Sequence, residues 1–484
     1  MSENPSIHDH ARTKIVATVG PASRSRPMLI KLVHAGVNVF RLNMAHGSHE
    51  EHTEVVNTIR EVSEELRRPI AILADLAGPK IRLGELPGGM IECTAGEEFR
   101  FVRGTVEEGE VCRPGELLTT YAPLIDELAV GDRVMLADAA VGLIVQEKTA
   151  DYAKCAVVQP GVIRSRQGVN LPGVKLSVPA MDAEDRRSAQ WAAQYEIDYL
   201  SLSFVRHPKD VLELKQMLYD WGSYAKVVAK IEKPEALLHL VEIVKAADAV
   251  MVARGDLGVE IDVAEMPLAQ KRIIKICNEH QKPVIIATQM LDSMQHSRLP
   301  TRAEVTDVAN AILDGADACM LSGETAIGNY PVETVAMMRR IAKATEEQFR
   351  ELPPPPEPSL PPTGVRKITQ AIVYGAGKVM RSIDVKLVFV VSRRGGTALA
   401  LSKRRILTPT VGISESERVL RQMCLYWGVH PIKGAPTRER KKLLDFIDHW
   451  GVGTGYVQPD DLVVIITGTG DGQEAHNGLE VHRV

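Results

Sequence analysis

The sequence predicts a (β/α)8 barrel that is interrupted by a small all-β domain and followed by a second, smaller α/β domain. Three observations lead to this α/β fold class. Eight short β-rich runs alternate with amphipathic helical stretches, a helix-poor segment separates the third run from the fourth, and a proline-rich segment precedes further alternating runs. Such alternation is typical of parallel sheets covered by helices.

The eight apolar runs give the expected strands of the barrel. They are KIVATVG (14–20), VNVFRLN (37–43), IAILADLAG (70–78), YLSLSFV (199–205), KVVAKIE (226–232), AVMVARGD (249–256), PVIIATQM (283–290) and ACMLSGET (318–325). The helical stretches include residues 50–66, 208–221, 235–246, 266–280 and 302–313. An open doubly wound sheet shows the same alternation, but the count of eight and the lack of G-x-G-x-x-G after the first run favour the barrel.

The expected domains follow from changes in composition along the chain. We expect residues 1–82 and 169–350 to form the (β/α)8 barrel, and residues 83–168, with short runs such as EEFRFV and GLIVQE between turns, to form an all-β lid domain inserted at its mouth. The segment ELPPPPEPSLPPT supplies a proline-rich linker at 351–363, and residues 364–484 form a C-terminal α/β domain.

Composition restricts the class of protein. The chain has 484 residues, 45% hydrophobic and 25% charged, with a formal net charge of -4, which argues against non-specific nucleic-acid binding. Its six cysteines are scattered without C-x-x-C spacing, as in reduced cytosolic proteins. Because no signal-like N-terminus or membrane-length apolar run occurs in the sequence, we expect a cytoplasmic, soluble protein with no nucleic-acid or membrane partner.

Charged and hydroxyl side chains gather where the apolar runs end. In a strand, residues two apart face the same side, so four pairs are expected to point together. The pairs are Lys230 with Glu232, Arg254 with Asp256, Arg41 with Asn43, and Ser322 with Glu324. A single pair is more simply an ion pair or a strand cap, but several at one barrel rim indicate a ligand or a metal that compensates the charge.

The side chains at this rim suit a hard metal ion and a phosphorylated substrate. Glu232 and Asp256 are carboxylates without neighbouring histidine or cysteine, which favours Mg²⁺ or Mn²⁺ over zinc. Arg41, Arg82 and Lys230 add positive charge, and phosphoryl transfer needs such cations beside a metal.

Longer motifs resemble one enzyme family. In order along the chain they are TKIVATVGPAS, FRLNMAHGSHEEH, DLAGPKIRLG, GVNLPG, AKIEKPE, MVARGDLGVEI, ATQMLDSM, PTRAEVTDVANAILDGADACMLSGETA and LYWGV. Together they resemble pyruvate kinase over nearly the whole barrel. The resemblance implies phosphoryl transfer from phosphoenolpyruvate to ADP in glycolysis, with pyruvate and ATP as products, and a homotetramer.

The resemblance also implies roles for single residues. Lys230 would stabilise the transferring phosphoryl group and the developing enolate, and Glu232 and Asp256 would bind the divalent metal. Backbone groups of Gly255 and Asp256, together with Thr288, would hold the substrate carboxylate.

Further roles concern protons, phosphate and nucleotide. The strand-end hydroxyls of Thr288 and Ser322 would belong to the proton route that converts enolpyruvate into pyruvate. Arg41 and Arg82 would bind phosphate oxygens, and Asn43 and His46, with Arg82, would lie near the nucleotide. A lone histidine in a turn is more often a cap or a surface residue.

Departures from the family pattern concern the monovalent cation. Many members hold K⁺ with Asn, Ser, Asp and Thr side chains, and here the matching residues are Asn43, Ala45, Asp75 and Leu76. Lys80 stands where K⁺-dependent members have glutamate, and its ammonium can replace a bound cation. We therefore expect no K⁺ requirement, although Lys80 could simply be a solvated turn residue.

Two further departures affect nucleotide contacts. Gln167 replaces the lysine usual before GVNLPG, with Arg164 and Arg166 close by as possible substitutes. Glu51 stands where a tyrosine is common in the family.

The C-terminal domain contains one candidate anion site. The segment SRRGGTALALSK (392–403) follows an apolar run and opens a helix, so its backbone N–H groups and arginines could bind phosphate. By resemblance this loop would hold the phosphate of an allosteric effector, a sugar phosphate or a nucleotide monophosphate. Its expected residues are Ser392, Arg393, Arg394, Gly395, Gly396 and Thr397. The alternative is a solvated basic turn.

Two other functions remain open from the sequence. A catalytically silent sensor of phosphorylated metabolites could use the same scaffold, but it would not need Lys230, Glu232, Asp256 and Thr288 together. A lyase or aldolase acting on a pyruvate enolate would share the metal chemistry, but it leaves the inserted domain and the nucleotide loop unexplained.

Overall fold

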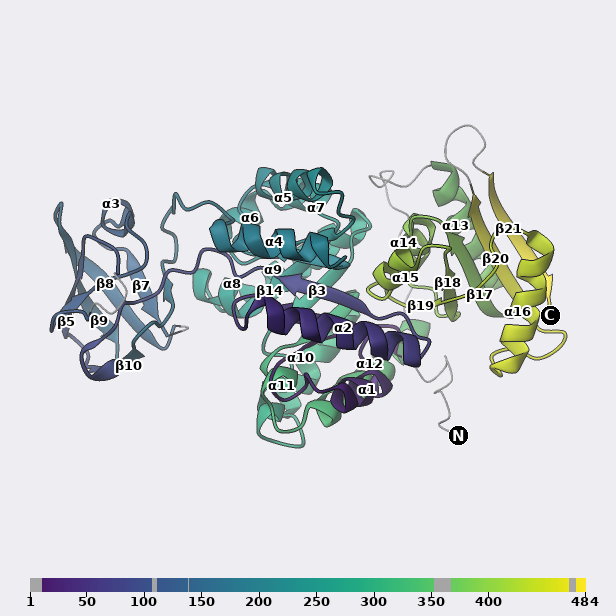
Figure 1. Ribbon diagram of the computed structural model, residues 1–484, viewed down its shortest axis with the longest axis horizontal. Helices are drawn as coiled ribbons and strands as arrows, with labels where there is room; N and C mark the ends of the chain where they lie inside the picture. Colours follow the sequence, from purple (N-terminus) through teal and green to yellow (C-terminus); the bar gives the residue numbers. More distant parts are fainter. Residues whose placement is uncertain (1–10, 107–110, 138, 352–366, 470–475) are drawn as a thin grey trace.

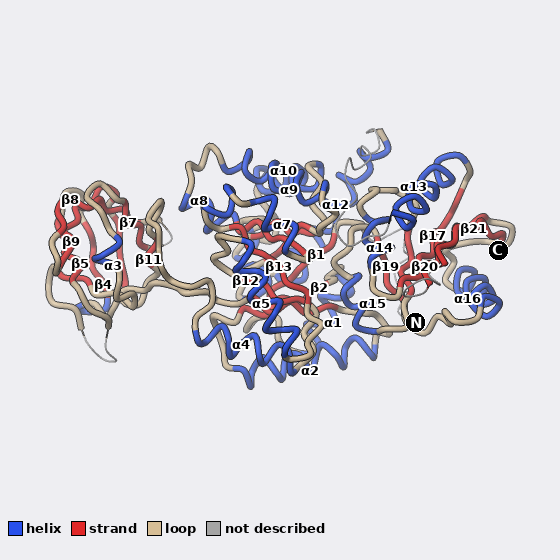
Figure 2. The backbone as a smooth tube through the Cα atoms, turned by 90° about the horizontal axis from the view of Figure 1, so that it is seen from above, coloured by secondary structure: helices blue, strands red, loops and turns tan. Residues whose placement is uncertain are grey.

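The computed structural model describes residues 11–106, 111–137, 139–351, 367–469 and 476–484. The chain forms three bodies in a row, with the inserted β domain at one end, the barrel in the middle and the C-terminal domain at the other end (Figure 1). The view from above shows the barrel strands surrounded by helices (Figure 2).

The central body is a closed parallel barrel with strand order β1-β16-β15-β14-β13-β12-β3-β2. Its strands are β1 (Lys14–Thr18), β2 (Val39–Asn43), β3 (Ala71–Asp75), β12 (Tyr199–Leu202), β13 (Lys226–Ile231), β14 (Ala249–Ala253), β15 (Val284–Ala287) and β16 (Ala318–Leu321). Each lies within one of the eight predicted runs, so the (β/α)8 fold is confirmed. The strands are shorter than the runs because the polar residues that end each run form loops or helix starts.

Amphipathic helices cover the barrel. They are α1 (Arg26–Ala35), α2 (His49–Glu65), α4 (Ala183–Gln194), α5 (Pro208–Asp220), α6 (Pro234–Leu238), α7 (Leu240–Ala246), α9 (Met266–Glu279), α10 (Arg302–Leu313) and α12 (Pro331–Glu346). Capping boxes at Ser48, Asp182 and Thr301 satisfy the first backbone N–H groups of α2, α4 and α10. The helix predicted over 235–246 is instead two helices, because the backbone leaves helical geometry at His239.

The inserted domain is built from mostly antiparallel strands around its own core, with one parallel pair between β5 and β6. One sheet has the order β11-β7-β8-β9-β5-β6, and β10 pairs with β4. The strands are β4 (Met90–Cys93), β5 (Glu98–Val102), β6 (Glu116–Leu117), β7 (Arg133–Leu136), β8 (Val141–Lys148), β9 (Tyr152–Gln159), β10 (Gly161–Arg164) and β11 (Val169–Asn170), with one short helix, α3 (Leu124–Glu127). An antiparallel bridge joins Arg82 to Gly168 where the chain leaves and re-enters this domain.

The C-terminal body has a five-stranded sheet of order β19-β18-β17-β20-β21, in which only β21 is antiparallel to its neighbour. The strands are β17 (Val385–Ser392), β18 (Thr410–Ile413), β19 (Val429–Ile432), β20 (Leu462–Thr469) and β21 (His476–Arg483). The helices are α13 (Lys367–Ser382), α14 (Gly396–Ser402), α15 (Glu417–Met423) and α16 (Arg440–Gly453). Most of the predicted linker, residues 352–363, lies outside the described residues.

The C-terminal domain closes one end of the barrel. Interior residues such as Val16 and Met251 belong to the same buried cluster as Leu425 and Tyr426. At the first residues of two strands, the Lys14 Nζ donates to the Val429 carbonyl over 2.7 Å and the Tyr199 hydroxyl donates to the Gln422 carbonyl over 2.5 Å. The opposite end, where the strands terminate, therefore remains for a site.

Among the described residues, no helix combines the length and the apolar character needed to cross a membrane.

Candidate active site

Four charged side chains converge at the ends of β2, β3 and β13. Asp75 Oδ2 accepts hydrogen bonds from Arg41 Nε at 2.8 Å and Nη2 at 2.5 Å. The Lys230 ammonium lies 3.4 Å from Asp75 Oδ1 and 2.7 Å from Glu232 Oε1. Both carboxylates are buried, so these ion pairs are shielded from water. The expected joint placement of Lys230 with Glu232 is confirmed.

The pKa values show how strongly these groups interact. Burial alone would raise the pKa of Asp75, but the charges of Lys230 and Arg41 outweigh it and lower that pKa to about 2. Burial would lower the pKa of Lys230, yet Asp75, Glu232 and Asp256 raise it well above its usual range. The Lys230 side chain is therefore a permanent cation, held by carboxylates around it.

Two serines that the sequence reasoning missed complete this cluster. The Lys230 Nζ donates to Ser203 Oγ over 2.7 Å, and the Ser201 hydroxyl donates to Asp75 Oδ1. Both serines are buried. A signal was present in YLSLSF, where two hydroxyls recur at the two-residue spacing of one strand face.

A second group of residues lies at the ends of β14 and β15. The Gly255 N–H donates to Thr288 Oγ1 over 2.8 Å, and the Thr288 hydroxyl itself donates to the Ala287 carbonyl over 2.6 Å. Thr288 has a φ of 66°, an uncommon conformation for a β-branched residue. The surrounding loop thus holds this hydroxyl over the start of α8 (Arg254–Glu260) at some conformational cost.

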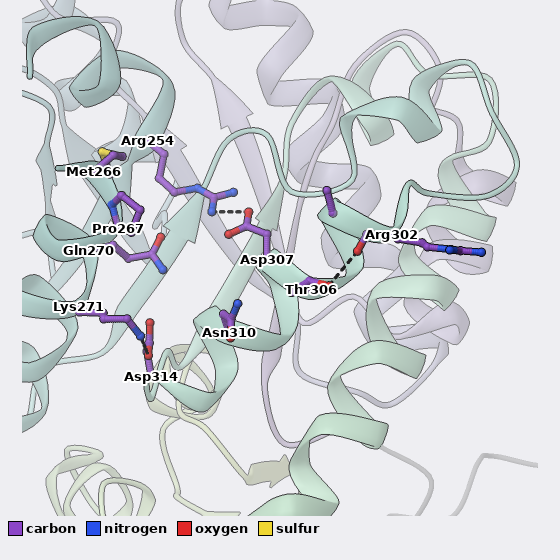
Figure 3. Close-up of a pocket in the computed structure, with 11 residues that line it drawn as sticks. Arg254, Met266, Pro267, Gln270, Lys271, Arg302, Thr306, Asp307, Asn310 and Asp314 are labelled. Carbon is purple, nitrogen blue, oxygen red and sulfur yellow. Dashed lines mark hydrogen bonds and ion pairs between the residues drawn. The ribbon is translucent and has the colours of Figure 1, made fainter. Parts of the chain in front are cut away.

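The expected pairing of Arg254 with Asp256 is wrong. The chain becomes helical at Arg254, so the two-residue period of a strand no longer applies. The Arg254 guanidinium donates to the Thr288 carbonyl over 2.8 Å and pairs with Asp307 at 2.5 Å, beside a cavity of about 640 Å³ between α9 and α10 (Figure 3). Asp256 is exposed, and its charge acts on both Lys230 and Glu232.

The expected pairing of Ser322 with Glu324 is wrong for the same reason. A short helix, α11 (Gly323–Ala326), begins directly after Ser322. Glu324 is buried and accepts hydrogen bonds from the Ser322 N–H at 2.6 Å and the Leu291 N–H at 3.1 Å. It thereby ties together the loops that follow β15 and β16. The Ser322 hydroxyl is buried and has no hydrogen-bond partner among the described residues.

The donor set fits a hard divalent cation. Burial raises the pKa of Glu232 more than the nearby Lys230 lowers it, so its carboxylate is short of positive charge. Glu232 Oε2 is already oriented by the Phe204 N–H at 2.8 Å. With Asp256 it would offer only oxygen ligands, as Mg²⁺ and Mn²⁺ prefer. Within the described residues, no group of three or more His, Cys, Asp and Glu side chains is placed to hold a metal.

Basic side chains surround the loop after β2. Burial lowers the pKa of His46, and the positive charges of Lys80, Arg82 and Arg41 lower it further, which places these cations around it. Lys80 is exposed, and the Arg82 guanidinium donates to the Arg166 carbonyl over 3.2 Å.

The other residues expected near the nucleotide make local contacts. Asn43 Oδ1 accepts from the Ala45 N–H at 3.3 Å, and Gln167 Oε1 accepts from the Arg164 N–H at 2.6 Å. Glu51 closes the capping box of α2 with Ser48.

The predicted anion loop of the C-terminal domain has the expected backbone geometry. Ser392 ends β17, Gly395 adopts a left-handed φ of 80°, and α14 begins at Gly396. Arg393 and Arg394 are exposed, whereas Thr397 is buried.

Comparisons with known proteins agree with this arrangement. The family model described as "Pyruvate kinase, barrel domain" matches residues 10–335, and "Pyruvate kinase, alpha/beta domain" matches residues 370–482. Proteins named "Pyruvate kinase" from Staphylococcus aureus strains USA300 and COL are each 39% identical to this chain over 480 residues. That alignment covers 98% of this chain and 80% of each relative. The chain therefore belongs to the pyruvate kinase family and is a phosphotransferase of this kind.

Proposed function

We propose that the protein transfers the phosphoryl group of phosphoenolpyruvate to ADP and releases pyruvate and ATP. The observation that carries this proposal is the Lys230 ammonium, fixed by Glu232, Asp75 and Ser203 at the open end of the barrel. A fixed cation at this point would neutralise charge that develops on phosphoryl and enolate oxygens.

The remaining site residues fit the two halves of the reaction. Gly255 and Asp256 backbone groups with Thr288 would hold the substrate carboxylate, while Arg41 and Arg82 would bind phosphate oxygens. The bond from phosphorus to the enol oxygen breaks, and a bond to a terminal oxygen of the ADP β-phosphate forms. The enolate then gains a proton at its methylene carbon.

The buried Ser322 hydroxyl is well suited to take part in that proton transfer, because no hydrogen bond from the described part of the chain occupies it. Thr288 would belong to the same route, and Asn43 and His46 would lie beside the nucleotide.

Glu232 and Asp256 would hold Mg²⁺ or Mn²⁺. When bound, the metal would supply further positive charge at the oxygens of the transferring group. Members of this family generally use Mg²⁺ and K⁺.

A coupled assay for pyruvate formation from phosphoenolpyruvate, ADP and Mg²⁺ tests the proposal. We expect turnover by the wild type, almost none by Lys230→Met, and normal turnover by Lys209→Met, an exposed lysine of α5. No turnover by the wild type would reject the function and favour a silent sensor. Normal turnover by Lys230→Met would reject the assigned role of this lysine.

We further propose that the enzyme needs no K⁺, with Lys80 near Asn43 and Asp75 in place of the monovalent cation. Its support is the exposed ammonium on the turn after β3, where the charge of Lys80 reaches His46. Wild-type activity should be equal in K⁺ and Na⁺ salts, whereas Lys80→Glu should be slow in Na⁺ and partly restored by K⁺. Activation of the wild type by K⁺ alone would contradict this.

We also propose allosteric regulation through residues 392–397. A left-handed glycine between a strand end and a helix start, next to two arginines, supports binding of a phosphate group. The double variant Arg393→Ala, Arg394→Ala should lose activation by sugar phosphates and nucleotide monophosphates but keep its basal rate. Arg440→Ala, which removes a surface ion pair with Glu480, is the matched control. Unchanged activation of the double variant would refute the site.

A homotetramer in the cytoplasm completes the proposal, and the assembly can be checked by light scattering. The domain boundaries 1–82 with 169–350, 83–168 and 364–484 are proposed as well, supported by the Arg82–Gly168 bridge.

A further inference from the structure

The two segments that connect the barrel with the inserted domain meet at one buried carboxylate, that of Asp185. Asp185 lies in the first turn of α4 and is 2% exposed. Its Oδ1 accepts from the Gly78 N–H at 3.1 Å, and its Oδ2 accepts from the Asp182 N–H at 3.2 Å. Gly78 belongs to the outgoing segment, and Asp182 ends the returning one.

The outgoing turn, residues 76–80, is held from its other side by β12 and the residue that follows it, since the Leu76 N–H donates to the Ser201 carbonyl over 3.1 Å. The Ser203 hydroxyl donates to the Leu76 carbonyl over 2.7 Å. Gly78 has a φ of 70°, and a Cβ there would lie 2.5 Å from the Phe204 ring. The turn is therefore fixed between β12 and α4 and requires glycine at this point.

A helix cap explains only half of the Asp185 contacts. The capping box with Asp182 uses the Asp185 N–H and one carboxylate oxygen. The other oxygen serves the turn before Lys80. Burial, with the charge of Asp182, raises the pKa of Asp185 to about 6, so keeping a carboxylate at this place costs free energy.

The turn determines where two cations lie. Lys80 ends it and Arg82 follows two residues later, and the charges of both act on His46 in the loop after β2. A shift of the turn would move both cations relative to that loop.

We propose that Asp185 is a positioning residue that fixes the turn 76–80 and thereby sets where Lys80 and Arg82 lie over the bound nucleoside diphosphate. The inference rests on the proposed function. The expected consequence of Asp185→Asn is a change in ADP binding, because the amide has a single acceptor oxygen for the N–H donors of both segments.

Asp182→Ala is the matched control, since it breaks the same capping box without touching the turn. Three readouts are compared: steady-state kinetics for both substrates, ADP binding by calorimetry, and amide exchange of residues 76–80 by mass spectrometry. For Asp185→Asn we expect ADP affinity and kcat/KM for ADP to fall about tenfold, the value of one hydrogen bond to a charged group. KM for phosphoenolpyruvate should rise by less than KM for ADP, because Arg41, the other residue assigned to phosphate oxygens, is held by Asp75 and not by the turn. Exchange in the turn should rise. Asp182→Ala should lower the thermal midpoint but leave ADP affinity and exchange in the turn as in the wild type.

Equal behaviour of the two variants would overturn the inference, because Asp185 would then act as a cap alone. If Asp185→Asn does not fold, exchange in the wild type decides: a protected Gly78 amide supports the clamp, and an unprotected one overturns it. Binding and exchange do not depend on turnover, so a wild type without kinase activity would reject the proposed function without affecting this result.

Discussion

Asp75→Asn should weaken the barrel by an amount that the structure allows to be estimated. The positive charges of Arg41 and Lys230 favour the ionised form of Asp75, and they lower its pKa from 3.8 to about 2 although the side chain is fully buried. At about 1.36 kcal/mol for each pH unit, this corresponds to about 2–3 kcal/mol of stability at neutral pH. The asparagine side chain cannot supply this stabilisation, because it carries no charge and offers only one acceptor oxygen.

The sign with pH follows from the lowered pKa. The stabilisation by the ionised Asp75 is complete above the unfolded pKa of 3.8 and is lost as the pH falls towards the folded pKa of about 2. The loss of unfolding free energy in Asp75→Asn, relative to the wild type, should therefore be constant between about pH 5 and 8. Scanning calorimetry should show the barrel transition about 5–10 °C lower in the variant. Turnover should fall as well, since Arg41 and Lys230 lose the carboxylate that orients both.

Asp384→Asn is the control for this experiment, because Asp384 is exposed and pairs only with the exposed Lys386 among the ion pairs of the described residues. Its midpoint should move by less than about 2 °C. If Asp75→Asn moved the barrel transition no further than this control, the ion-pair argument would be refuted.

Two further predictions concern Glu232 and the base of the barrel. Because burial raises the pKa of Glu232, protons should compete with the metal for its carboxylate, and the Mn²⁺ affinity measured by electron paramagnetic resonance should fall as the pH is lowered. Glu232→Gln should bind Mn²⁺ weakly at every pH. A wild-type Mn²⁺ affinity that does not change with pH would contradict this. Asp317→Asn should destabilise the protein by about 3–5 kcal/mol in calorimetry, because Lys403 and Arg405 would remain buried without their carboxylate; a variant as stable as the wild type would contradict this.

The parallel barrel could be predicted because its signal is local and repeated. Each strand is an apolar run of four to six residues, and the polar residues that follow mark where it ends. The joint placement of Lys230 and Glu232 could be predicted because β13 keeps the two-residue alternation of a strand up to Ile231, directly before Glu232. The same period failed at Arg254 and Ser322, where a helix starts directly after the strand.

Other features depend on contacts between distant segments. Nothing in the local sequence shows that Asp185 reaches Gly78, 107 residues away in the chain, or that Ser203 reaches Lys230. The same holds for Glu324, whose bond to Leu291 joins two loops. These carboxylates and hydroxyls look like ordinary caps in the sequence, because a cap and a long-range acceptor use the same residue types.

The closure of the barrel by the C-terminal domain has a consequence for synthesis on the ribosome. The inner layer of the barrel packs against residues 423–426, which are translated about 100 residues after β16 is complete. A nascent chain that has emerged only to the end of α12 would expose the apolar base of its barrel, together with Asp317 and Lys14 that await partners from the C-terminal domain. The barrel base therefore gains its final contacts only when the C-terminal domain has been made, and the apolar surface exposed until then favours aggregation.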